Sequence, residues 1–82
     1  MTQEYPLYEH TTDEKWDTIR ATRDQKIKAI EWRRFRNQDE IALSETPSDD
    51  AETMTAVLQY IQDLRNITDQ ADPDSITWPV QP

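Results

Sequence analysis

The sequence predicts an all-α fold, an antiparallel two-helix hairpin with extended N- and C-terminal arms. Apolar residues recur at helical spacing in two separate segments, each segment follows a helix start signal, and neither Gly nor Pro interrupts residues 12–46. A polar link of about nine residues between the two segments favours antiparallel neighbours. We therefore expect an extended arm at residues 1–11, a helical hairpin at 12–68 and an extended Trp-Pro tail at 69–82 that packs on the hairpin or on a partner.

Length and composition limit what such a chain can do. It has 82 residues, of which 34% are hydrophobic, so we expect one small domain with a marginal core. It has no cysteine and one histidine, His10, which excludes a disulfide, a thiolate metal site and a histidine cluster. No apolar run approaches the ~20 residues needed to cross a bilayer, and the N-terminus lacks the basic and apolar regions of a signal peptide. We expect a soluble, intracellular protein with no membrane partner.

The first helix is expected to run from about residue 12 to about residue 37. In the arm before it, Pro6 favours extended backbone. Thr11 and Glu14 fit a capping box, in which each satisfies a backbone N–H group of the other. Arg23 interrupts a helical stripe of four apolar residues, namely Trp16, Ile19, Ile27 and Ile30. Beside this stripe lie three residues that either widen the buried face or mark a change of partner near the helix end, namely Ala21, Trp32 and Phe35.

The second helix has a stronger start signal. We expect Thr46 as its N-cap, because Pro47 follows at the first helical position and Asp49 stands three residues after the cap. The helix is expected to end near Thr68. Its apolar positions follow an amphipathic pattern, namely Ala51, Met54, Val57, Leu58, Ile61, Leu64 and Ile67.

The tail follows a breaker at Pro73. Its prolines permit an edge strand or a polyproline-like arm but no central strand. Apolar residues alternate there with polar or proline residues, at Ile76, Trp78 and Val80. We expect Trp16 and Trp32 to cap the two ends of the hairpin core. Trp78 either folds back to complete the core or anchors the protein to a partner, and we expect it to fold back with an edge that a partner can reach.

Charge is distributed unevenly along this chain of net charge -8. Residues 13–36 carry eight basic and five acidic side chains, whereas the rest carries one basic residue, Arg65, and twelve acidic ones. One interpretation is a register device, in which cations at the end of the first helix (Arg33, Arg34, Arg36) lie beside anions at the start of the second (Asp49, Asp50, Glu52), as the helix dipoles favour. The other is a surface for a partner. Arg23 either reaches an acid of the second helix, such as Asp63, or keeps its head group in water.

The sequence offers little for catalysis. It contains no glycine, which excludes the common phosphate-binding loops, and its only histidine lies in the expected arm. The aspartates at positions 69, 72 and 74 lack the glycine and glutamate of a calcium loop. Net acidity and the mixed charges of the first helix do not suit a phosphate groove. We expect no catalytic residue, no metal ligand, no cofactor and no nucleic-acid partner.

Three ordered motifs resemble the small bacteriophage tail assembly chaperones and the C-terminal region of tail fibre assembly proteins. These motifs are W16-x-x-I19-R20-x-x-R23-D24-x-x-I27, then Y60-x-x-x-L64-R65-N66-I67, then P73-x-x-I76-x-W78-P79. They span residues 16–79. The family's usual Asp before the aromatic residue late in the first helix is replaced here by Glu31, and a second family Asp is replaced by Asn66.

The resemblance implies a non-enzymatic assembly factor that binds a phage tail fibre or another tail protein and aids its folding, trimerisation or attachment. It would act in the host cytoplasm during assembly and then leave or stay on the virion tail. Its oligomeric state stays open between a homo-oligomer and a complex with a trimeric client. The expected partner-binding residues are Trp16, Arg20, Arg23, Tyr60, Arg65, Trp78, Pro79 and Val80. A second function stays open, that of a small acidic regulatory or inhibitory protein that mimics nucleic acid on a host protein.

Overall fold

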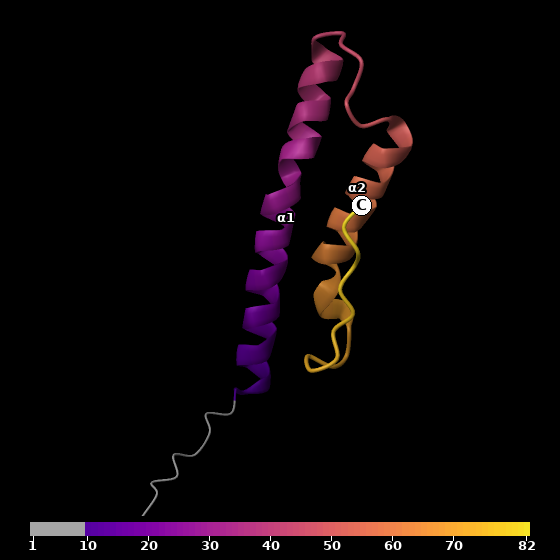
Figure 1. The fold of residues 1–82 in the computed structure, drawn as a ribbon. Helices are drawn as coiled ribbons and strands as arrows, with labels where there is room; N and C mark the ends of the chain where they lie inside the picture. Colours follow the sequence, from indigo (N-terminus) through magenta and orange to yellow (C-terminus); the bar gives the residue numbers. More distant parts are fainter. Residues whose placement is uncertain (1–9) are drawn as a thin grey trace, which may run out of the picture.

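The computed structural model describes residues 10–82, and this part of the chain contains helices and no strand. In order, the helices are α1 (Thr12–Ala42), α2 (Ala51–Arg65) and the short 3-10 helix η1 (Ile67–Asp69). Figure 1 shows α1 and α2 side by side, joined at one end by a loop, with the tail running back beside α2. The all-helical class with two main helices is therefore confirmed for the described residues. The arm expected at 1–11 lies, except for its last two residues, outside them.

Helix α1 begins where the capping box predicts. The Thr11 hydroxyl accepts a hydrogen bond from the backbone N–H of Glu14, and the Glu14 carboxylate accepts one from the backbone N–H of Thr11. Two of the donors that a helix start leaves unpaired are thereby satisfied.

The predicted end of α1 near residue 37 is wrong, because the helix continues to Ala42. It ends in a Schellman motif, in which the N–H of Ser44 donates to the carbonyl of Ile41 and that of Glu45 donates to the carbonyl of Glu40. Ser44 has a φ angle of 57°, the left-handed region in which glycine is usual at this position. A chain without glycine gives no sequence sign of such an end.

The predicted N-cap of the second helix, Thr46, is also wrong. The cap is Asp50, whose carboxylate accepts a 2.7 Å hydrogen bond from the backbone N–H of Thr53. Pro47 lies in the loop, and the residues after it are held by α1 instead of starting a helix. The Ser48 hydroxyl and backbone N–H both donate to the Glu40 carboxylate, at 2.7 and 3.1 Å.

The core is small and joins both helices. Its central cluster consists of Ile30, Val57, Tyr60, Ile61 and Leu64. Ile27, Met54 and Trp78 pack against this cluster, while Ile19 and Ile67 are buried nearby. Both predicted apolar stripes therefore supply the core, but Leu58 is about half-exposed and the unpredicted Tyr60 is buried.

Two aromatic residues expected beside or over the core face away from it. Trp32 and Phe35 are each 54% exposed. Because Ile30 points at α2, residues two and five positions later lie on the opposite side of a helix with 3.6 residues per turn. The prediction that Trp32 caps the core is wrong, and the widening of the buried face by these residues is excluded in this structure.

Candidate partner-binding site

A hollow lies where the tail turns back over the end of α2. Helix α2 ends at its C-cap Asn66, and η1 follows with Ile67 buried. The chain then reverses through a turn in which the Asp72 carboxylate accepts a hydrogen bond from the backbone N–H of Asp74. The ammonium group of Lys15 on α1 lies 2.9 Å from the Asp74 carboxylate, so this turn is attached to α1.

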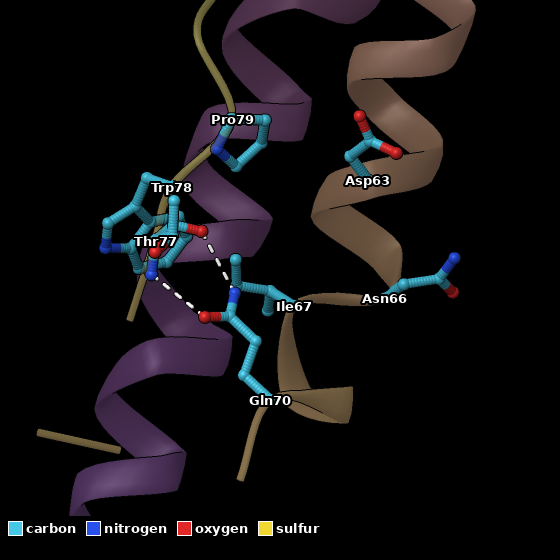
Figure 2. Close-up of a pocket in the computed structure, with 7 residues that line it drawn as sticks. All are labelled: Asp63, Asn66, Ile67, Gln70, Thr77, Trp78 and Pro79. Atoms are coloured by element: carbon cyan, nitrogen blue, oxygen red, sulfur yellow. Dashed lines mark hydrogen bonds between the residues drawn. The ribbon is translucent and has the colours of Figure 1, made fainter. Parts of the chain in front are cut away.

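Gln70 fixes the course of the returning tail. Its side-chain amide pairs with the backbone of Thr77, donating to the carbonyl and accepting from the N–H, each at 2.9 Å. The pair works like one rung of a β-ladder made by a side chain, and Figure 2 shows both bonds. It places Trp78 against the core cluster, partly buried.

The hollow has a volume of about 360 Å³. Figure 2 shows Trp78 and Pro79 of the tail on one side and Asp63 of α2 on the other, while the side chain of the C-cap Asn66 points away from the tail. Its lining is completed by Ile67, Gln70 and Thr77. The wall from the tail is mainly apolar and the wall from α2 is polar, an arrangement that suits a ligand with an apolar stem and a polar end.

A second group of side chains, the loop clasp, lies at the other end of the helix pair and consists of Arg33, Arg36, Glu40, Ser48 and Asp49. Arg33 donates two 3.1 Å hydrogen bonds to the Asp49 carboxylate, and Arg36 donates a third at 3.2 Å. The hydrogen bond from Arg33 lowers the pKa of Asp49 and raises the pKa of Arg33. The hydrogen bonds from Ser48 lower the pKa of Glu40.

The loop clasp confirms one part of the register interpretation of the charges and contradicts another. Ion pairs do join the basic segment to the acids before α2, as the register interpretation requires. The dipole argument for the arginines is wrong, however, because α1 continues past them and its last turn contains no basic residue. Arg33 also reaches the tail, where Nη1 donates a 3.0 Å hydrogen bond to the carbonyl of Pro82.

The expected partner-binding residues do not converge on one surface. Trp78 and Pro79 line the hollow, and Val80 beside them is 90% exposed. Tyr60 is 5% exposed in the core, so in this conformation its ring packs the fold and is not available to a partner. The remaining four residues lie elsewhere, with Trp16 and Arg23 partly buried and Arg20 and Arg65 exposed.

The arginines among them pair with near neighbours along their own helices. Arg20 bonds Asp17 at 2.8 Å, Arg23 bonds Asp24 at 3.0 Å, and Arg65 donates to the side chain of Gln62 at 3.3 Å. The pairing of Arg23 with Asp63, considered from the sequence, is not formed. Arg23 pairs with Asp24 instead, and the Asp63 carboxylate accepts from Gln59.

Sequence reasoning missed most of the lining of the hollow, namely Asp63, Asn66, Ile67, Gln70 and Thr77, as binding residues. No helical period connects the end of α2 with the tail, because their contact depends on the reversal after η1. The prolines and the tryptophan of the tail were the one feature of the sequence that indicated a binding site in this region.

The described residues also bear on two other classes of function, metal binding and membrane insertion. Within residues 10–82, no three or more His, Cys, Asp or Glu side chains are grouped so that they could hold a metal ion. In the same part of the chain, neither helix combines the length and apolar character that crossing a membrane demands.

Comparison with known proteins identifies the family. Searches of curated proteins and of solved structures returned no match. A family profile described as phage tail assembly chaperone protein matches residues 16–82, which includes α1 from Trp16 onward, all of α2 and the whole tail around the hollow. On this match, which covers most of the sequence, the chain belongs to the phage tail assembly chaperone family.

Proposed function

We propose that this protein is a non-enzymatic chaperone that binds a tail fibre or another tail protein of its phage and aids that protein's folding, trimerisation or attachment. The observation that carries the proposal is the family match over residues 16–82. We place its action in the host cytoplasm during virion assembly.

We infer that the working unit is an antiparallel hairpin at 12–68 with the tail at 69–82 folded onto it. Contacts at three positions along the helix pair support this arrangement. The core cluster joins Ile30 of α1 to α2, the loop clasp joins Arg33 to Asp49, and Lys15 near the start of α1 meets Asp74 after the end of α2. Contacts in this order support the inference that the two helices run in opposite directions.

Exposed apolar side chains support a binding role. Isolated ones are ordinary on a protein surface, but here they gather in the last third of α1 and in the tail. They are Trp32, Phe35, Ile41 and the C-cap Leu43 in the first region and Val80 in the second, while Leu58 stands alone on α2. We propose the tail, with Trp78, Pro79 and Val80 beside the hollow, as the main client contact, because its neighbouring prolines limit the entropy lost when a partner docks.

The remaining expected binding residues take secondary places in this proposal. Arg20 and Arg65 are exposed and can form rim contacts, which contribute more to association rate than to affinity. Trp16 and Arg23 are partly buried, so only the exposed part of each side chain can contact a client.

Co-expression tests the proposal. The C-terminal part of the tail fibre from the same phage is produced with and without this chain, and soluble, trimeric fibre is measured by centrifugation and native mass. We expect soluble trimer only when the chain is present. Other tail proteins of the phage are tested in parallel, and an unchanged yield for all of them would contradict the proposal.

A further inference from the structure

We infer that the hollow between α2 and the tail is a binding site for an arginine side chain presented by the client. This inference rests on the proposed function, because it specifies the chemistry by which a tail protein is recognised. Three features of the hollow favour a planar cation with an apolar stem.

The tail supplies an aromatic and apolar wall. Trp78 and Pro79 line the hollow, and Trp78 is only partly buried. A guanidinium group stacks on an aromatic face, and the methylene groups of the arginine stem pack well against proline. The Trp78 ring already has one cation near it, because Lys26 Nζ lies 5.4 Å from the ring centroid. Lys26 comes from α1 and is not part of the lining.

The opposite wall supplies negative charge. Asp63 is exposed and lines the hollow. Its Oδ1 accepts a 2.7 Å hydrogen bond from Gln59, which leaves Oδ2 without a hydrogen bond from the described residues. Asn66 and Ile67 lie at the C-terminal end of α2, where the helix dipole is negative and favours a cation. No basic residue lines the hollow.

The surrounding charge favours the same ligand. Residues 60–82, which contain the lining of the hollow, have four acidic residues (Asp63, Asp69, Asp72 and Asp74) and one basic residue, Arg65. Arg65 donates to Gln62 and is outside the lining. A cationic segment is therefore attracted towards this part of the surface, whereas an acidic one is repelled. The volume of about 360 Å³ is at the small end for binding sites and suits one side chain with its flanking backbone.

The test is an NMR titration of the complete 15N-labelled chain with three blocked tripeptides. Acetyl-Ala-Arg-Ala-amide carries the proposed ligand. The citrulline peptide has the same shape without the charge, and the lysine peptide has the charge without the planar group. The readouts are the Trp78 indole N–H and the backbone N–H of Ile67, which both belong to residues that line the hollow. We expect both to shift with the arginine peptide, and the affinity for the citrulline peptide to be weaker by about five-fold or more.

Two variants of equal net charge separate this site from general attraction. Asp63→Asn keeps the acceptor for Gln59 but removes the charge, and we expect it to weaken arginine binding by about five-fold. Glu52→Gln removes an exposed charge from the first turn of α2, far from the hollow, and we expect it to bind like wild type. Equal binding of the arginine and citrulline peptides, or wild-type binding by Asp63→Asn, would overturn the inference.

The co-expression assay keeps this inference separable from the proposed function. If wild type and Asp63→Asn both yield soluble client, the chaperone role stands and the arginine site is overturned as its means of recognition. If wild type yields none with any tail protein, the proposed function fails, whatever the peptides do. Yield with wild type that falls with Asp63→Asn, and not with Glu52→Gln, supports both.

Discussion

Arg33 connects its own helix to two other parts of the chain that are far apart in the sequence. It belongs to α1, donates two hydrogen bonds to Asp49 in the loop and donates a third to the carbonyl of Pro82 in the tail. The side chains of Arg33 and Asp49 are 15% and 11% exposed, so this pair is better shielded from solvent than a typical surface ion pair. A bidentate guanidinium–carboxylate pair also fixes geometry, which lysine in place of Arg33 would not reproduce.

The Asp49 interaction makes stability depend on pH in the acid range. The pKa of Asp49 is lowered in the folded chain, so its ionised form favours folding. This stabilisation is complete above the usual aspartate value of about 3.9 and is lost as the pH falls through the lower folded value. We expect Asp49→Asn to lower the melting temperature at pH 7, and the difference from wild type to shrink below about pH 4. Circular dichroism melts from pH 7 to pH 2 measure both.

Glu45→Gln is the matched control, because Glu45 is an exposed acid of the same loop. It should change the melting temperature little at any pH. A constant difference between wild type and Asp49→Asn across the whole pH range would contradict the assigned role of the Asp49 charge.

The tryptophans differ in what they do for the fold. Trp78 packs against the core cluster, whereas Trp16 lies outside it and Trp32 is exposed. We expect Trp78→Ala to lower the free energy of unfolding by about 2 kcal/mol, less than the value for a fully buried ring, because Trp78 is only partly buried. Trp16→Phe should cost less than about 1 kcal/mol. Urea unfolding monitored by circular dichroism gives both values, and equal, small effects would count against a special role for the tail.

At the scale of the elements, the sequence predicted helix boundaries and buried faces correctly only where local signals are strong. The start of α1 followed from the Thr11–Glu14 capping box, and the buried faces followed from the spacing of Ile19, Ile30, Val57, Ile61 and Leu64. The other boundaries depend on contacts between distant residues. Thr46 and Pro47 resemble a helix start, but the bonds that Glu40 and Arg33 make to the next two residues delay the helix until Asp50.

The end of α1 offers a direct test of its Schellman motif. Ser44 has a φ angle of 57°, which costs a residue with a Cβ about 1 kcal/mol and costs glycine little. Ser44→Gly should therefore stabilise the protein by about 1 kcal/mol, raising the melting temperature by about 4–8 °C. Ser44→Ala retains the Cβ and should give no such gain. A lower melting temperature for Ser44→Gly than for Ser44→Ala would show that Ser44 does not adopt this conformation in solution.

At the scale of the whole molecule, the core is small for the length of the chain. Seven hydrophobic residues of the described chain are buried, and one side of the core is completed by a tail without regular secondary structure. A domain of this size has a free energy of unfolding of a few kcal/mol. The hollow could not be predicted from the sequence, because it exists only once Gln70 has paired with Thr77 and the tail lies over α2.

Marginal stability makes client binding visible in the melting curve. A client that binds only the folded chain stabilises it by about 2.7 kcal/mol at a free concentration of 100 times Kd. For a domain of this size we expect the melting temperature to rise by about 10 °C or more. Intrinsic tryptophan fluorescence follows the transition if the client fragment lacks tryptophan, and a denatured client is the control for nonspecific crowding. No shift at saturating client would count against binding to this fold.

The central claim is that this chain binds a tail protein of its phage, and native mass tests it most directly. The purified chain is mixed with the purified C-terminal part of the tail fibre and passed over a size-exclusion column with light-scattering detection. The account predicts one co-eluting peak whose mass is that of the fibre trimer plus bound copies of this chain. Separate elution of the folded chain and the fibre at their individual masses, repeated with every other tail protein of the phage, would contradict it.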